Sequence, residues 1–181
     1  MKLTKELEKD YYRSFGTYEY KYNNFRKNIG FRYIYYWRKL KSASSLITKI
    51  YYKYKLHNIR KRTNIEIPLS VNIEAGIVMI HPYSITINSK ATIGKNFTIL
   101  KGATIGNTKG KKTGTPIIGN NVYIGLNAVV VGNIKVGNNV LIAGNSFVNF
   151  DVPDNSIVIG NPGVVHRKSD ATNEYITNKI D

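Results

Sequence analysis

The sequence predicts an all-β core, a parallel β-helix, preceded by an α-helical segment. Three observations predict it. Aliphatic side chains recur every six residues between positions 67 and 148. Before position 65, apolar residues recur at steps of three and four, which is the spacing of a helix face. The charge balance changes at the same place, because residues 1–64 hold 17 Lys and Arg against 4 Asp and Glu, whereas residues 65–181 hold 10 against 7.

The six-residue repeat is the strongest pattern in the chain. Its aliphatic positions are Ile67, Ile73, Met79 and Ile85, then, after a slip of two residues, Ile87, Ile93, Ile99 and Ile105, and finally Ile118, Ile124, Val130, Val136, Ile142 and Val148. A helix face repeats every 3.6 residues and a flat strand every two, so a period of six indicates a short strand plus a corner, three of which make one triangular turn. Glycine follows the aliphatic residue at positions 94, 106, 119, 125 and 137. We expect these glycines at sharp corners with a positive φ angle.

The segment before the repeat is predicted to be basic, tyrosine-rich and helical, since it holds 11 of the 14 tyrosines. A short helix is expected over Thr4–Tyr12, and longer ones over Phe25–Leu40 and Leu46–Leu56. Gly30 and Ser42–Ser45 are the expected breaks between them.

Composition excludes several classes of protein. The chain has no cysteine, so it has no disulfide, thiolate nucleophile or cysteine metal site. The longest aliphatic run, Ile77–Ile80, is too short to span a bilayer. Met1–Asp10 is charged and lacks the apolar stretch of a signal peptide. We expect a cytoplasmic protein.

We place the repeat region at residues 65–165. One segment inside this region and the segment after it do not follow the repeat. Asn107–Pro116 has no apolar residue fit for the interior and is predicted to be an extruded loop. Loops on rigid scaffolds commonly carry function, and a tolerated surface insertion is the alternative. Residues 166–181 form a C-terminal tail, of which Ser169–Asp181 is polar and expected to be loose.

Of the three histidines, only His81 lies within the repeat, beside the two-residue slip. Pro82 fixes its own φ and biases His81 toward an extended backbone, which would hold the imidazole in one direction. An imidazole accepts a proton near neutral pH. His81 is therefore a candidate general base, and a surface histidine on a corner is the other interpretation that its position allows.

Five stretches of the repeat region carry a family resemblance. They are Ile65–Pro68, Ile80–Pro82, Ala103–Gly106, Pro116–Gly125 and Val158–Gly163. These stretches are similar to the hexapeptide-repeat acyltransferases, in particular serine acetyltransferases and the sugar O-acetyltransferases of capsule and lipopolysaccharide clusters. The resemblance implies a left-handed coil, acetyl-CoA as co-substrate and a homotrimer. It also implies that His81 is the catalytic base and that Glu66, 15 residues earlier, orients it.

Two departures from the serine acetyltransferase pattern bear on the acceptor. Ile80 stands where those enzymes carry an aspartate, and Thr115 stands where they carry a second active-site histidine. Both positions bind the amino-acid substrate in that family. The resemblance therefore favours a sugar hydroxyl in capsule, exopolysaccharide or lipopolysaccharide biosynthesis. A serine O-acetyltransferase of cysteine biosynthesis is one alternative, and a non-catalytic scaffold that binds a membrane or a partner is another.

The resemblance implies that CoA lies in a groove between neighbouring subunits, along the C-terminal coils. The positions that it assigns to CoA are Gly125, Ala143, Asn145 and Pro162, with Gly106, Asn107 and Thr108 at the start of the loop. The basic candidates for the CoA phosphates are Arg167 and Lys168, and in the loop Lys109, Lys111 and Lys112. No metal is expected, because β-helices such as the γ-class carbonic anhydrases hold zinc with three histidines and this coil has one.

Residues 17–62 mix aromatic with basic side chains, and three interpretations stay open. The segment can cap the open end of the β-helix, which is otherwise an unpaired edge. It can also contact an anionic membrane surface, since both residue types favour the headgroup zone at the inner face. Binding of nucleic acid through basic and aromatic groups is the least favoured interpretation.

Overall fold

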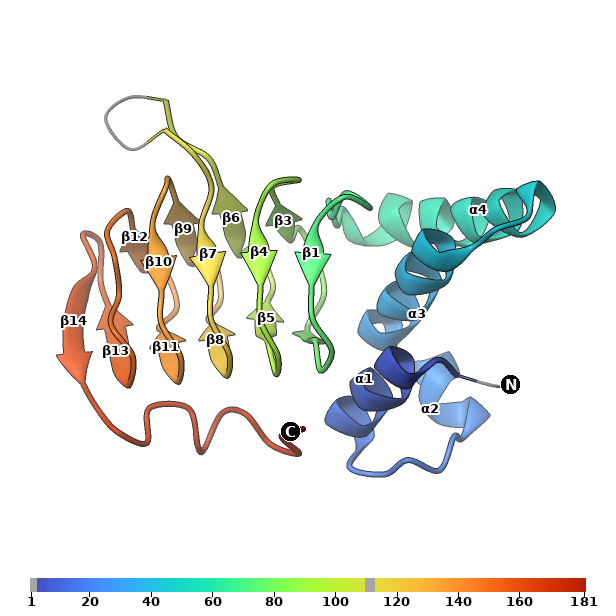
Figure 1. Ribbon diagram of the computed structural model, residues 1–181, viewed down its shortest axis with the longest axis horizontal. Coiled ribbons are helices and arrows are strands. Elements are labelled where there is room, and N and C mark those ends of the chain that lie inside the picture. The colour runs from blue at the N-terminus through green and yellow to red at the C-terminus, as the bar shows by residue number, and fades with distance from the viewer. Residues whose placement is uncertain (1–2, 110–112) are drawn as a thin grey trace.

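The computed structural model describes residues 3–109 and 113–181, which form a triangular coil of strands with helices at one end (Figure 1). The helices are α1 (Lys5–Phe15), α2 (Tyr22–Lys27), α3 (Ile29–Ser42) and α4 (Leu46–Thr63). The first face of the coil holds β1 (Asn72–Ile73), β4 (Thr92–Ile93), β7 (Ile117–Ile118) and β10 (Lys135–Val136). The second face holds β2 (Val78–Ile80), β5 (Thr98–Leu100), β8 (Val122–Ile124), β11 (Val140–Ile142), β13 (Ser156–Ile159) and β14 (Val164–Arg167). The third face holds β3 (Thr86–Ile87), β6 (Thr104–Gly106), β9 (Val129–Val131) and β12 (Phe147–Val148).

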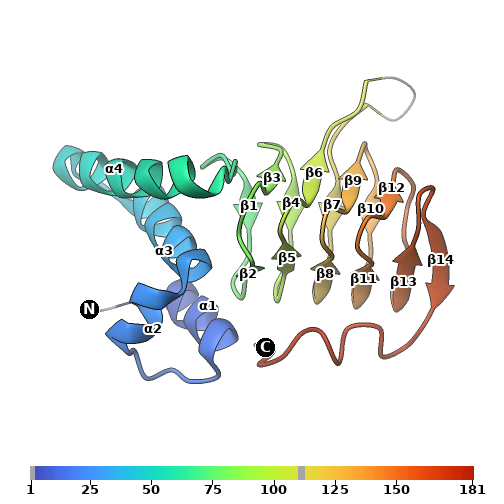
Figure 2. The same ribbon diagram turned by 180° about the vertical axis from the view of Figure 1, so that it is seen from behind.

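Successive turns of the coil stack in register, and this register confirms the predicted repeat. On the first face Ile73 pairs with Ile93, which pairs with Ile118, all in parallel. β14 turns back and pairs with β13 in antiparallel fashion at the far end (Figure 2). All fourteen aliphatic residues of the repeat are at most 5% exposed, so they fill the interior of the prism as predicted.

Three edges of the prism separate its faces. We name each edge after the asparagines, the histidine or the loop that lies on it. The asparagine edge joins the first face to the second and comprises residues 74–77, 94–97, 119–121, 137–139 and 153–155. The His81 edge joins the second face to the third and comprises residues 81–85, 101–103, 125–128 and 143–146. It is continued by residues 160–163, which connect β13 to β14 and hydrogen-bond to Phe147. The loop edge joins the third face to the first face of the next turn and comprises residues 88–91, 107–109, 113–116, 132–134 and 149–151.

The prediction for the repeat glycines was wrong about their backbone. None of these five residues has a positive φ. A Cβ atom on Gly119 would lie 2.7 Å from the carbonyl oxygen of Gly137 in the next turn, so glycine is needed there for close stacking. Asparagine takes many of the positive φ angles at the corners instead, because its short polar side chain tolerates the left-handed region. These asparagines are at positions 96, 121, 127, 139, 145 and 155, with φ between 53° and 58°. Glycines outside the five repeat positions, such as Gly76 and Gly102, take others.

Four of these asparagines form a hydrogen-bonded ladder along the asparagine edge. Asn96 Nδ2 donates to Asn121 Oδ1 at 2.9 Å, and Asn121 Nδ2 donates to Asn139 Oδ1 at 3.0 Å. Asn139 Nδ2 donates to Asn155 Oδ1 at 3.2 Å. The ladder ties each turn to the next, which adds a side-chain network to the backbone pairing.

The helical segment caps the open base of the coil, as one of the three interpretations proposed. Trp37 of α3 and Leu56 of α4 lie in the same buried cluster as Ile67 and Met79 of the first turn. Gly30 is not a break, since it lies inside α3. A Cβ there would lie 2.7 Å from the Met79 carbonyl oxygen, so glycine lets the helix approach β2.

The other expected helix limits agree with the structure more closely. Asn28 ends α2 and caps α3, because its Oδ1 accepts the Phe31 N–H at 2.8 Å. The expected first helix is confirmed as α1, which begins after its N-cap Thr4 and runs to Phe15.

A buried ion pair fastens α1 to the first turn of the coil. Asp10 is 0% exposed, and its carboxylate accepts Arg38 Nε at 2.5 Å and the backbone N–H of Gly76 at 2.7 Å. Arg38 also donates to the carbonyl oxygen of Glu74 at 2.8 Å. Burial raises the pKa of Asp10, and the Arg38 guanidinium opposes that rise.

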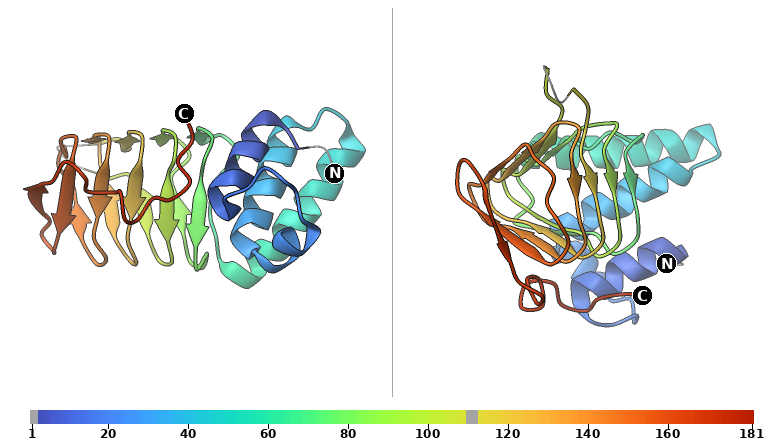
Figure 3. Two further views of the ribbon diagram at one scale, coloured as in Figure 1. Left: turned by 90° about the horizontal axis from the view of Figure 1, so that it is seen from below. Right: turned by 60° about the vertical axis from the view of Figure 1, so that its left-hand side comes forward.

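The expectation of a loose C-terminal tail was wrong. The tail runs back along the coil from β14 to α1 (Figure 3). Ala171, Thr172, Ile176 and Ile180 are buried along this path. The polar sequence did not reveal this anchoring, because side chains elsewhere in the chain hydrogen-bond to the tail backbone: Arg13 binds Thr177 and Asn96 binds Ile180. A few buried apolar residues of the tail add to these bonds.

Candidate functional site

His81 begins the corner that leads from β2 to β3. Five residues, His81–Ile85, make this connection, whereas three residues, Lys101–Ala103, connect β5 to β6 in the next turn. The two-residue slip seen in the sequence is therefore a longer corner at the first turn. A longer corner at the His81 edge exposes the imidazole beyond the regular surface of the coil.

The backbone of His81 differs from the extended form that Pro82 was expected to favour. Its φ is 48°, in the left-handed region that residues other than glycine rarely adopt. Ser84 also has a positive φ, of 53°, and its N–H donates to the Thr63 carbonyl oxygen at 2.7 Å. Pro82 is buried. The packed ring and this contact with the end of α4 hold the corner against its local preference, and such strained residues cluster at functional sites.

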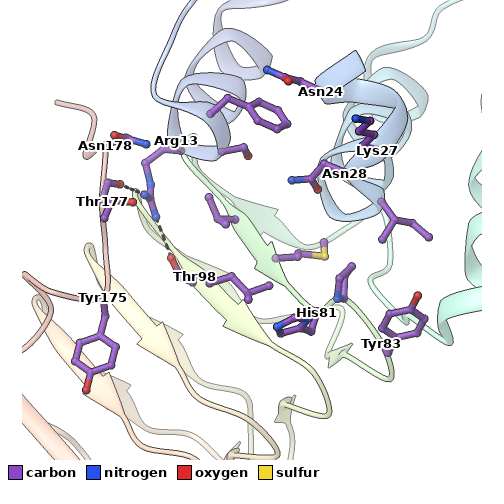
Figure 4. A pocket seen from close by; sticks show the side chains of 17 residues that line it. Arg13, Asn24, Lys27, Asn28, His81, Tyr83, Thr98, Tyr175, Thr177 and Asn178 are labelled. Atoms are coloured by element: carbon purple, nitrogen blue, oxygen red, sulfur yellow. Dashed lines mark hydrogen bonds between the residues drawn. The ribbon is translucent and has the colours of Figure 1, made fainter. Parts of the chain in front are cut away.

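The His81 imidazole is exposed and makes no hydrogen bond with any residue in the two described ranges. It lines a cleft of about 630 Å³ on the outside of the second face (Figure 4). Residues from four separate parts of the chain line this cleft: Arg13 and Phe15 of α1, Asn24 and Lys27 of α2, the strands β2 and β5, and Tyr175, Thr177 and Asn178 of the tail. We call it the His81 cleft.

The structure places four of the predicted CoA-binding residues on the same edge as His81. Gly125, Ala143, Asn145 and Pro162 all lie at corners of the His81 edge. The corners are stacked by backbone hydrogen bonds: Gly102 N to Tyr83 O at 2.9 Å, Asn127 N to Lys101 O at 2.9 Å, and Asn145 N to Leu126 O at 2.8 Å. A ligand lying along this edge would therefore run from His81 toward the C-terminal turns.

The loop residues lie on a different edge of the same chain. Gly106 ends β6, and Asn107, Thr108 and Lys109 follow it at the loop edge. Thr108 and Gly114 pair there as an antiparallel bridge at the base of the loop. Thr115 donates from its hydroxyl to the Lys90 carbonyl oxygen at 3.1 Å. Lys111 and Lys112 lie outside the described residues. One chain thus keeps its loop apart from its own His81 edge.

The basic pair of the tail lies at neither of these places. Arg167 pairs with Ser156 at the end of β14, and its guanidinium donates to the Asp154 carbonyl oxygen at 2.5 Å. The backbone N–H of Lys168 donates to the carbonyl oxygen of Asn155. Both residues are exposed at the asparagine edge, across the second face from Pro162.

Glu66 lies on the third face, near the corner that His81 begins. Glu66 forms a parallel bridge with Thr86 on the third face, just beyond the His81 corner. Its side chain is exposed and lines another cavity, beside Arg60 and Asn64. Among the described residues, the Glu66 carboxylate makes no hydrogen bond to His81.

Sequence reasoning missed the walls of the His81 cleft. Lys27 lies 54 residues before His81 and Tyr175 lies 94 residues after it. Neither belongs to the repeat or to a motif, so no local pattern could have joined them to the site. Only the packing of the helices α1, α2 and α3 and of the tail around the second face brings them together.

No protein-family model matches the sequence. The chain is 41% identical over 95 residues to WcaB of Escherichia coli K12, named as a colanic acid biosynthesis acetyltransferase, a match that covers 52% of this chain and 59% of that protein. It is 44% identical over 103 residues to a serine acetyltransferase of Staphylococcus aureus, which covers 56% of this chain and 48% of that protein. The chain thus spans only about half the length of these curated relatives.

Solved structures extend the likeness to the fold. A Neisseria gonorrhoeae serine acetyltransferase superimposes with a TM-score of 0.71 and 27% identity over 91% of this chain and 63% of that chain. A serine acetyltransferase in complex with CoA has a TM-score of 0.65 and 27% identity, and covers 77% of this chain and 57% of that one. The fold is therefore a left-handed β-helix with a helical N-terminal segment, as predicted. Within that class the chain resembles both serine acetyltransferases and an acetyltransferase of polysaccharide synthesis.

Proposed function

We propose that the protein is an acetyl-CoA-dependent O-acetyltransferase that acetylates a sugar hydroxyl in the synthesis of a surface polysaccharide. The observation that carries this proposal is the position of His81. Its imidazole is exposed on a strained corner, lines the His81 cleft, and lies on the edge that also holds Gly125, Ala143, Asn145 and Pro162.

The reaction follows from these groups. His81 accepts the proton of the acceptor hydroxyl, and the oxygen attacks the carbonyl carbon of the acetyl thioester. The carbon–sulfur bond breaks, the acetyl group stays on the acceptor, and the departing thiolate takes the proton from the imidazolium. Backbone N–H groups at the stacked corners can stabilise the oxyanion, since the turns there approach closely. Glu66 is assigned the orienting role, which needs its exposed side chain to turn toward the imidazole.

We propose a homotrimer because one chain does not assemble the predicted site. Its loop residues Gly106–Lys109 and its His81 edge are on different edges of the prism. A ring of three chains would place the loop of one chain against the His81 edge of the next. The phosphates of CoA would then lie near the basic side chains of the loop, of which Lys109 is the candidate among the described residues. Arg167 and Lys168 lie at the asparagine edge, so they would reach the phosphates only from across the second face.

The relatives support two acceptors, a sugar and serine. WcaB and a serine acetyltransferase are similar to this chain to nearly the same degree. Ile80 and Thr115 favour the sugar, because an aliphatic side chain and a short hydroxyl cannot hold the charged groups of an amino acid as an aspartate and a histidine can. Serine O-acetylation therefore stays the second candidate.

A kinetic screen tests the activity and separates the candidates. Purified protein with acetyl-CoA would be offered L-serine and a panel of neutral and acidic methyl glycosides, and the release of the CoA thiol would be followed. A sugar-dependent rate with none for L-serine supports the proposal. A serine-dependent rate alone supports the second candidate, and no binding of acetyl-CoA by calorimetry would leave the non-catalytic scaffold.

We also propose that α4 holds the protein on an anionic membrane surface, at the inner face. Five apolar or aromatic residues of α4 are 50–81% exposed: Leu46, Ile47, Ile50, Tyr51 and Tyr54. The helix carries six Lys or Arg and no Asp or Glu. It projects outward from the base of the coil, away from the strands (Figure 1). Within the described residues no helix has the length and apolar character to cross a bilayer. Exposed apolar groups beside cations that form no ion pair with a described residue suit the headgroup zone.

A further inference from the structure

We propose that the His81 cleft is the acceptor subsite and that it selects an anionic saccharide, whose negative charge is recognised by Lys27. This inference rests on the proposed acetyl transfer at His81 and adds the charge of the acceptor and the residue that reads it.

Strands, helices and the tail enclose the cleft, and the candidate general base His81 lies at one end of it (Figure 4). The outer sides of β2 and β5 form the floor, the start of α3 with α2 forms one wall, and the tail forms the other. His81 and Tyr83 lie at one end, and Arg13 lies deeper, between the helices and the tail. A volume of about 630 Å³ suits one or two sugar rings rather than a single small amino acid.

The charges of the cleft are all of one sign. Arg13, Lys27 and His81 are its basic residues, and no Asp or Glu side chain lines it among the described residues. Each of the three guanidinium nitrogens of Arg13 donates a hydrogen bond, to the carbonyl oxygens of Gly76 and Thr177 and to Thr98 Oγ1. Arg13 is 4% exposed, so it shapes the cleft rather than binding a ligand.

Lys27 is the cation that is left to bind a ligand. It is exposed at the end of α2, and it forms no ion pair with any residue that the structure describes. An ammonium group in a cleft without carboxylates attracts a carboxylate or phosphate on the ligand. The acceptor that fits is therefore a uronic acid or another acidic sugar, with its hydroxyl toward His81 and its charge toward Lys27.

The neutral groups of the cleft suit a sugar ring. Tyr83 is 43% exposed and Tyr175 is 49% exposed, so each offers an aromatic face for the C–H side of a ring. Asn24, Asn28 and Asn178 add amide donors and acceptors for hydroxyl groups. Tyr175 is held in place by its ring contact with Tyr123, with centroids 5.1 Å apart.

CoA is another anion that could bind Lys27. The experiment must therefore distinguish binding of an acidic sugar from binding of CoA. The probes are methyl β-D-glucuronide and methyl β-D-glucoside, which share a ring and differ in one carboxylate. Binding to the full-length protein would be followed by the shifts of the His81 imidazole signals in NMR spectra, and acetyl-CoA binding would be measured by calorimetry. The variants are Lys27→Gln and, as a matched control, Lys5→Gln, an exposed lysine of α1 that does not line the cleft.

We expect the glucuronide to shift the His81 signals and to bind about five- to tenfold more weakly to Lys27→Gln, the loss typical of one charge-assisted hydrogen bond. The glucoside should bind weakly to all variants, and acetyl-CoA affinity should not change. Equal binding of the two glycosides, or unchanged glucuronide binding in Lys27→Gln, overturns the proposal. So does a loss of acetyl-CoA affinity alone, which would assign Lys27 to CoA. An active His81→Ala variant would overturn the proposed base and leave this charge test standing.

Discussion

The side chain of Asn96 binds both backbone groups of Ile180: its Oδ1 accepts the Ile180 N–H at 2.9 Å, and its Nδ2 donates to the Ile180 carbonyl oxygen at 2.9 Å. One residue of the asparagine edge therefore anchors the tail that forms a wall of the His81 cleft. Asn96 is 4% exposed, so both bonds are shielded from water.

We expect Asn96→Gly to release the end of the tail. Glycine keeps the φ of 56° without strain, so the variant isolates the loss of three side-chain hydrogen bonds, two with Ile180 and one with Asn121, about 1.5–4.5 kcal/mol in total. Limited proteolysis should cut the tail of Asn96→Gly much faster than that of the wild type. Equal cutting rates would mean that Ile176 and Ala171 hold the tail without Asn96.

The Asp10–Arg38 pair predicts a large and non-additive loss of stability. Asp10→Ala leaves the Arg38 guanidinium, 6% exposed, without its buried partner, and should lower the free energy of unfolding by about 3–5 kcal/mol. Asp10→Ala with Arg38→Met should cost less than the sum of the two single changes. Urea unfolding measures all three. Additive losses would show that the two side chains stabilise the fold independently.

Because the turns stack closely at the corners, we expect one added methyl group at Gly119 to lower the free energy of unfolding. Gly119→Ala places a Cβ 2.7 Å from the Gly137 carbonyl oxygen, and should cost about 1–3 kcal/mol or more in thermal or urea unfolding. Gly106→Ala is the control, because its nearest neighbour is a methyl group of Val131 at 3.3 Å, which can move. Similar losses in the two variants would contradict the stacking explanation.

The exposed face of α4 predicts binding to anionic vesicles. The protein should co-sediment with phosphatidylcholine–phosphatidylglycerol vesicles, less with phosphatidylcholine alone, and less as salt rises. Ile47→Glu with Ile50→Glu should weaken binding at least about tenfold, since the apolar contact is lost and like charges are added. Vesicle binding that survives this change would sink the assignment. If the change instead alters the sedimentation of the free protein, α4 is a contact between copies.

The regular part of the fold was predictable because burial leaves a period in the sequence. The fourteen aliphatic residues of the repeat, from Ile67 to Val148, were predicted to face the interior, and all of them are buried. Local backbone geometry was less predictable. Asparagine, and not the five glycines that follow the repeat aliphatics, takes the left-handed conformation at six corners. His81 adopts a φ of 48° against the extended backbone that Pro82 favours, because tertiary packing outweighs that local preference.

The candidate site was predictable only where it coincides with the repeat. His81 and the corners from Gly125 to Pro162 share an edge, which follows from the period. The rest of the site depends on contacts between distant segments, such as Arg13 with Thr177, that no spacing reveals. Polar tails and short helices carry no burial pattern strong enough to place Lys27 or Tyr175 beside His81.

The most direct test of the account is the rate of acetyl transfer by His81→Ala, with the acceptor that gives the highest rate in the screen. His166→Ala is the control, because that exposed histidine on β14 lies outside the His81 cleft. We predict that His81→Ala still binds acetyl-CoA and loses about 10²–10⁴-fold in kcat, while His166→Ala keeps the wild-type rate. A folded His81→Ala protein that acetylates the acceptor at the wild-type rate would contradict the assignment of His81 as the base.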